Sequence, residues 1–128
     1  MEHKIKTVED AFKAKGLDYN SLPDVSSFPE YIRKYILNHF ILTVVVSALN
    51  EGWEPNFNDH NERKYFCWFE VDANEDNRAG FGFSDTDCGT WHSISAVGSR
   101  LCFKSRELCY YAAEQFPELW KENQLILK

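Results

Sequence analysis

Four side chains that could act together chemically lie within one short stretch: Asp85, Asp87, Cys88 and His92. All four are possible metal ligands, although their spacing matches no recognised metal site. Cys88 with His92 could also supply the nucleophile and the base of a small hydrolase-like enzyme. A polar loop between two strands accounts for the same residues equally well. They are therefore weak candidates for a catalytic or metal site, and no cofactor is expected.

A second group of residues with functional potential is mainly aromatic. If the strands described below form, alternation places Phe66, Trp68 and Trp91 on one face of a sheet, with Arg100 and Lys104 at its side. A sheet face in water normally carries polar residues, and contiguous exposed aromatic side chains usually mark an interface. The leading prediction is a non-enzymatic module that binds a protein partner, or a second copy of itself, through this open face.

Two other interpretations of the aromatic face stay open. The segment 53–63, or the first helix, could cover the face as part of the core. Trp68 and Trp91 could instead bind a small aromatic or sugar ligand. The first interpretation needs a buried face, whereas the ligand and the protein partner both need an open one.

The first pair of strands is predicted from period-two alternation. In residues 64–71 every second side chain is apolar, which is typical of a strand with one buried face. A turn follows, and residues 79–84 are expected to return beside the first strand. This register sets Trp68 opposite Gly82, so that a large aromatic side chain covers a bare backbone position.

A second hairpin is predicted around Gly98 and Ser99, because glycine suits the first position of a two-residue turn. Closing the turn there sets Ala96 against Leu101, and the returning strand continues to Lys104. Register and hydrophobic pattern agree in this hairpin. Together the two hairpins predict a four-stranded antiparallel meander.

Helices are expected before and after the sheet. Their boundaries are predicted from capping and helix-breaking residues, namely Thr7 and Gly16, Pro29 and Gly52, and Ser105 and Pro117. The second helix should be the longest, although the valine-rich stretch 40–46 is also compatible with a buried strand. Pro117 is expected to end or kink the last helix.

The predicted fold class is therefore α+β, with a single domain over residues 1–128. Two N-terminal helices precede the four-stranded antiparallel meander sheet, and a C-terminal helix packs on one face of that sheet. No repeat or linker in the sequence suggests a second domain.

Charge and composition limit the partners. The net charge is −6, and residues 53–92 carry nine acidic and three basic side chains. Nucleic-acid binding is not expected, because it needs clustered lysine and arginine. The first ten residues do not resemble a signal peptide, and the apolar run 40–49 is too short to span a bilayer. The sequence predicts a cytoplasmic protein without a membrane partner.

The four cysteines show no C-x-x-C pair: Cys67, Cys88, Cys102 and Cys109. In the absence of an export signal, free thiols are predicted rather than disulfides. Cys67 and Cys109 are expected to face the core, and Cys102 the outer side of the sheet.

Four segments carry a resemblance to a known group of proteins: Trp53-x-Pro55, residues 64–69, residues 80–83 and, most specifically, residues 97–108. At these positions the chain resembles a family of small uncharacterised proteins from prophages and other mobile elements of gut bacteria. Cys67 stands where the family has proline. The resemblance implies a mobile-element setting and no activity, ligand or catalytic residue.

Overall fold

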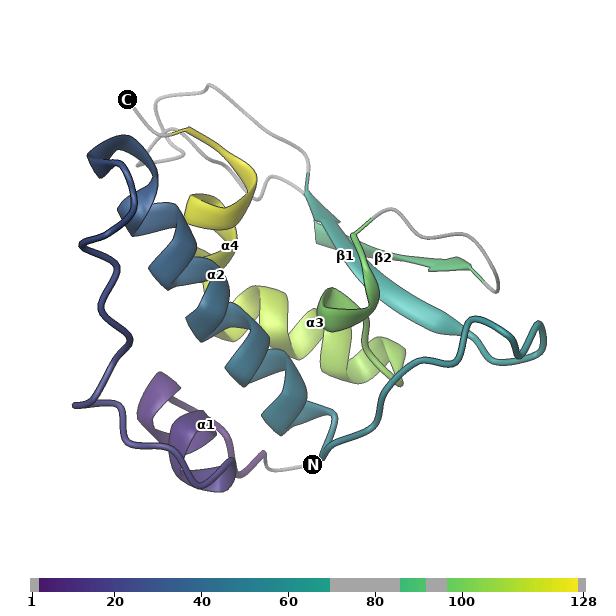
Figure 1. Cartoon of the computed structure of the whole chain (residues 1–128). Coiled ribbons are helices and arrows are strands. Elements are labelled where there is room, and N and C mark those ends of the chain that lie inside the picture. Colours follow the sequence, from purple (N-terminus) through teal and green to yellow (C-terminus); the bar gives the residue numbers. More distant parts are fainter. Residues whose placement is uncertain (1–2, 70–85, 92–96, 127–128) are drawn as a thin grey trace.

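The computed structural model describes residues 3–69, 86–91 and 97–126, and of residues 86–91 the backbone alone. The helices and strands in chain order are α1 (Val8–Ala14), α2 (Glu30–Leu49), β1 (Lys64–Phe69), β2 (Thr86–Trp91), α3 (Arg106–Gln115) and α4 (Pro117–Gln124). Figure 1 shows α2 as the central helix, with the two strands to one side beside α3. The described chain is therefore mostly helical.

α1 begins at a capping box, as the sequence predicts. The Thr7 hydroxyl accepts a hydrogen bond from the Asp10 N–H at 3.1 Å, and the Asp10 carboxylate accepts one from the Thr7 N–H at 3.1 Å. The Lys6 N–H donates to the same carboxylate and lowers the pKa of Asp10. The chain turns away at Gly16, whose φ of 72° lies in the left-handed region. Both ends of the first helix are confirmed.

α2 is confirmed as the longest helix, and the alternative of a strand at 40–46 is wrong. Its C-terminal half is deeply buried, with Leu42 and Val45 at its centre. α1 packs beside this half and α4 beside the N-terminal half (Figure 1). The Asn38 side chain joins α2 to α4 by donating to the Leu119 carbonyl at 2.9 Å. α2 thus holds the other helices in place.

Among the described residues, α2 is the single helix long and apolar enough to cross a membrane. That result reflects length and composition alone, and a core helix of a soluble protein meets the same criterion. Here α2 makes contacts with α1, α3 and α4.

The predicted four-stranded antiparallel sheet, and with it the α+β fold class, is wrong. The described chain has four α-helices and one two-stranded antiparallel ladder. β1 forms where a strand is predicted, but its partner is β2, which the sequence analysis assigned to a polar loop. The predicted partner, residues 79–84, lies outside the described residues.

The register of the ladder differs from the predicted one. Trp68 lies opposite Asp87 instead of Gly82, and Phe66 lies opposite Gly89. An aromatic residue does face a glycine across the ladder, but at a different pair of positions. β2 contains two threonines and a tryptophan, which favour strands, beside an aspartate and a glycine, which favour turns. Cross-strand pairing decides between these local preferences.

The second predicted hairpin is wrong on its described side. Gly98 has a φ of 84°, as a turn there requires, but Ser99–Leu101 continue as a short 3-10 helix. Of the described residues after this turn, Phe103 alone pairs with β1, through two backbone hydrogen bonds to Tyr65 of 2.7 and 3.1 Å. In a run as short as residues 101–103, alternating apolar residues fit a 3-10 turn followed by one bridging residue as well as they fit a strand. Residues 92–96 lie outside the described part of the chain.

The helices after this bridge follow the prediction. Ser105 caps α3 by accepting a hydrogen bond from the Leu108 N–H at 3.2 Å. Pro117 ends α3 and occupies the first turn of α4, where a missing N–H costs no hydrogen bond. α3 packs against both strands, and Trp120 of α4 lies against Phe69 of β1, with 5.6 Å between ring centroids. The expected break at Pro117 is confirmed.

The cysteines depart from the prediction of four free thiols. Cys109 is disulfide-bonded, whereas Cys67 and Cys102 are free and buried. The Cys67 Sγ lies 2.8 Å from the Cys109 Sγ. Burial raises the pKa of the Cys67 thiol, and it raises the pKa of Cys102 to about 11 although the charge of Lys64 acts in the opposite direction. Cys102, expected on an outer sheet face, is in the core.

Denaturing the protein without reductant is expected to release fewer than four titratable thiols, with Cys67 and Cys102 among them. In the native protein at mildly alkaline pH, both should alkylate slowly, because a raised pKa leaves little of the reactive thiolate. Alkylation followed by peptide mass spectrometry measures both quantities. Four free thiols in denaturant without reductant would contradict the disulfide at Cys109.

Candidate functional site

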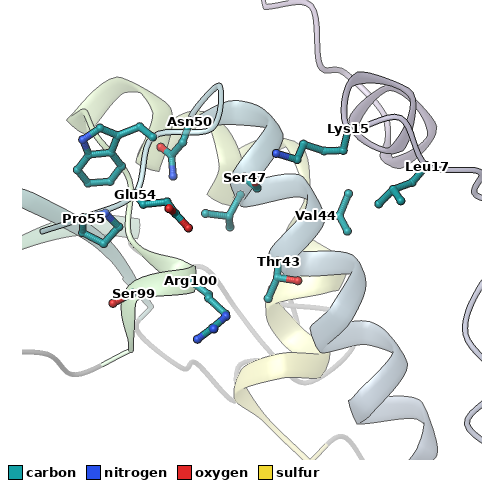
Figure 2. A pocket seen from close by; sticks show the side chains of 12 residues that line it. Lys15, Leu17, Thr43, Val44, Ser47, Asn50, Glu54, Pro55, Ser99 and Arg100 are labelled. Carbon is teal, nitrogen blue, oxygen red and sulfur yellow. The ribbon is translucent and has the colours of Figure 1, made fainter.

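A groove of about 540 Å³ runs beside the C-terminal half of α2. One face of α2 forms its floor. Lys15 and Leu17, just after α1, form one wall, and the loop 53–55 together with Ser99 and Arg100 forms the other (Figure 2). The site is therefore assembled from four segments that are far apart in the sequence.

The floor of the groove combines apolar and hydroxyl side chains. Thr43, Val44 and Ser47 come from successive turns of α2. The Thr43 hydroxyl already donates to the Phe40 carbonyl at 2.7 Å. The Ser47 hydroxyl has no hydrogen-bond partner among the described residues, so it is the floor group that is available to a ligand.

Asn50, at the end of α2, holds one wall in place. It is 3% exposed, and its side chain donates to the Cys102 carbonyl at 2.8 Å and accepts from the Lys104 N–H at 3.1 Å. An ion pair of 3.4 Å between Lys104 and Glu51 lies at the surface of the same junction. These contacts fix the 3-10 turn against α2. The wall is therefore preformed.

The loop after α2 is held by a buried lysine. Gly52, with a φ of 83°, turns the chain out of the helix. Lys64 is 0% exposed, and its ammonium donates to the Asp59 and Glu62 carbonyls at 3.1 and 3.0 Å. The Phe57 ring lies over the same ammonium at 5.1 Å. This network closes the loop onto the start of β1.

Three charged side chains line the groove. Lys15 reaches across α2 from one wall, while Glu54 and Arg100 extend from the other (Figure 2). Within the described residues none of the three forms an ion pair. Two basic groups and one acidic group are thus left for interactions with a bound molecule.

The weak catalytic and metal candidates are not assembled in the described part of the chain. The backbones of Asp87 and Cys88 belong to β2, whereas Asp85 and His92 lie outside the described residues. Among the side chains that the structure describes, no group of three His, Cys, Asp or Glu could hold a metal ion. The Cys88 and His92 hypothesis stays a prediction.

The structure describes the predicted aromatic surface only in part. Phe66 is partly buried and Trp68 is 41% exposed on β1, while only the backbone of Trp91 is described, in β2. Arg100 lies in the groove, and Lys104 belongs to the junction beside Asn50. The prediction that these residues form one surface stays a prediction, because the Trp91 side chain lies outside the described part of the chain.

The two ends of the predicted aromatic face differ in how far they are covered. The loop after α2 covers the Lys64 end of the face, where Phe57 lies against the ammonium. Trp53, expected to help cover the face, lines the groove instead. The Trp68 end stays open to solvent.

Three of the lining residues were not predicted from the sequence: Lys15, Ser47 and Glu54. A lysine at a helix end, a serine in an apolar helix and a glutamate in a turn carry no motif that marks them as functional. Gly52 followed by Trp53-x-Pro55 was the available signal, since it predicts a turn that returns an aromatic residue to the helix end.

No family model, curated protein or solved structure matches this chain. The resemblance to small proteins of mobile elements therefore stays a prediction.

Proposed function

We propose that this chain is a non-enzymatic binding domain and that the groove beside α2 holds a small organic ligand. The observation that carries the proposal is the groove itself, whose volume of about 540 Å³ falls within the roughly 300–1,000 Å³ of small-molecule sites. Such sites are mostly apolar, with a few polar groups that orient the ligand. Val44 and Trp53 supply the apolar surface here, and Ser47 with the three charged side chains supplies the polar groups.

The groove also has the rigidity that binding favours. Asn50 fixes the wall formed by the 3-10 turn, and Lys64 fixes the loop that carries Trp53. A preformed site loses less conformational entropy when a ligand enters than a site that must first be ordered. The wall formed by the loop 53–55 and the 3-10 turn can therefore keep its position in the absence of ligand.

Screening the protein with a library of small organic fragments tests this proposal. Fragments are expected to shift the amide resonances of Val44, Ser47 and Trp53 in 1H–15N NMR spectra. Ser47→Leu should abolish these shifts, because the larger side chain fills the floor, whereas Lys34→Gln on the exposed N-terminal half of α2 should not. The melting temperature of each variant shows whether it folds. Fragment shifts that lie elsewhere, or that survive Ser47→Leu, would contradict the proposed site.

Association through the outer face of β1 is a second candidate, and it retains the predicted protein partner or homodimer. The supporting observation is Trp68, a large aromatic residue that remains 41% exposed. Exposed aromatic side chains are enriched at protein interfaces.

Trp68→Ser tests this second candidate. The substitution is expected to cost the fold less than the roughly 3–5 kcal/mol of a fully buried tryptophan, because Trp68 is 41% exposed. It should lower the mass of a dimer, or weaken capture of a partner, in light scattering at matched concentration. A large fall in melting temperature with an unchanged monomeric mass would exclude the interface.

A further inference from the structure

We infer that the groove recognises a small organic carboxylate whose remaining part is flat and apolar. The inference rests on the proposed function and adds the chemical class of the ligand. It follows from the signs of the charges in the groove and from the shape of the apolar surface beside them.

The basic side chains come from opposite walls. Lys15 extends from the end of α1 and Arg100 from the 3-10 turn, and both line the same groove (Figure 2). Within the described ranges neither has an acidic partner, although the chain as a whole has a net charge of −6. Two basic groups without an internal counter-ion produce a local positive potential that favours an anion. A guanidinium binds a carboxylate with two parallel N–H donors, and an ammonium adds a mobile point charge.

Glu54 limits how much negative charge the ligand can carry. Its carboxylate lies in the same groove as the two basic side chains, so the three side chains carry a net charge of +1. One carboxylate on the ligand neutralises that charge, whereas a second negative charge would stay uncompensated in the groove. Glu54 can also accept a hydrogen bond from a hydroxyl or amine on the ligand, next to the unpaired Ser47 hydroxyl.

The apolar part of the ligand has surfaces on three sides. Val44 forms the floor, Leu17 stands on one wall, and Trp53 with Pro55 stands on the other. Trp53 is partly buried, so its position is restrained, and its indole ring presents a flat apolar face. A planar ring is the shape that contacts this face over the largest area.

Two probes that differ only in charge test the inference. Phenylacetate is a flat carboxylate, and phenylacetamide has the same shape without the charge. Each is titrated into the full chain at low ionic strength while the groove amides are followed by 1H–15N NMR. Phenylacetate is expected to bind about threefold or more tightly than phenylacetamide, and added salt should reduce the difference.

Removing a basic or an acidic side chain from the groove should change the affinity for phenylacetate in opposite directions. Arg100→Gln and Lys15→Gln should each weaken phenylacetate binding by about threefold and leave phenylacetamide unchanged. Glu54→Gln should strengthen phenylacetate binding by a similar factor. Lys34→Gln removes the same charge from an exposed site outside the groove and should change neither probe.

The possible outcomes separate the inference from the function on which it rests. Equal affinity for the two probes, with shifts at Val44 and Trp53, would overturn the preference for carboxylates and keep the groove as a binding site. Weaker binding after Glu54→Gln would also overturn it. If neither these probes nor the fragment library shifts the groove amides, the proposed function itself is wrong.

Discussion

Replacing Trp120 by alanine is expected to destabilise the protein by about 3–5 kcal/mol. Trp120 is 1% exposed and is the largest of the fully buried side chains in the described core. Its ring lies 5.6 Å from Phe69 and 6.4 Å from Phe103, and its indole N–H donates to the Ala112 carbonyl at 3.2 Å. Alanine would leave a cavity where α4 meets the ladder, because backbone and side chains relax only partly around a lost tryptophan.

Urea unfolding followed by circular dichroism measures this loss. Tyr31→Ala serves as the matched control, since it removes an aromatic side chain that is 87% exposed and should change the free energy of unfolding by about 0.5 kcal/mol or less. Trp120→Phe should fall between the two, because it fills part of the cavity and loses the hydrogen bond. Equal midpoints for the Trp120→Ala and Tyr31→Ala variants would show that α4 does not belong to the cooperative core.

Lys64→Ala is expected to cost about 3 kcal/mol. The substitution leaves the Asp59 and Glu62 carbonyls without their buried donor and removes the counter-charge that lies 3.4 Å from the Glu62 carboxylate. Glu62 is partly exposed and also accepts from the Asn56 N–H at 2.7 Å, so its charge is not wholly uncompensated. The expected loss is therefore at the lower end of the range for a broken buried ion pair.

Lys64→Met separates the contribution of the apolar stem from that of the hydrogen bonds and the charge. Methionine keeps most of the apolar stem, so the cost that remains measures the hydrogen bonds and the charge. Unfolding in urea gives the free energies, and amide exchange in the segment 53–62 shows whether the loop has opened. A Lys64→Ala variant as stable as the unmodified protein would mean that the loop holds its shape without the ammonium.

The helices could be predicted because their signals lie close together in the sequence. The Thr7 and Asp10 capping box and the Ser105 cap are each formed within three or four residues. Pro117 ends a helix because it has no backbone N–H, which α3 would need for its next hydrogen bond. Each of these signals survives in the structure because no distant contact competes with it.

The ladder could be predicted only in part, because strand pairing joins distant residues. The alternation that marks β1 is local, and the strand is confirmed. Its partner β2 packs against α3, and a single sequence does not show that contact. The groove is hidden for the same reason: Lys15, Ser47 and Arg100 come together only after α1 and the 3-10 turn have packed on α2.

Asn50 has a consequence for the connectivity of the chain. Its two hydrogen bonds to the backbone at Cys102 and Lys104 join positions more than fifty residues apart, so they close the intervening segment into a loop. The conformational entropy lost when the ends of a loop are joined grows only slowly with the number of residues in the loop. Residues inserted at the exposed Asn58, within this segment, are therefore expected to cost little stability, since both ends of the segment stay attached.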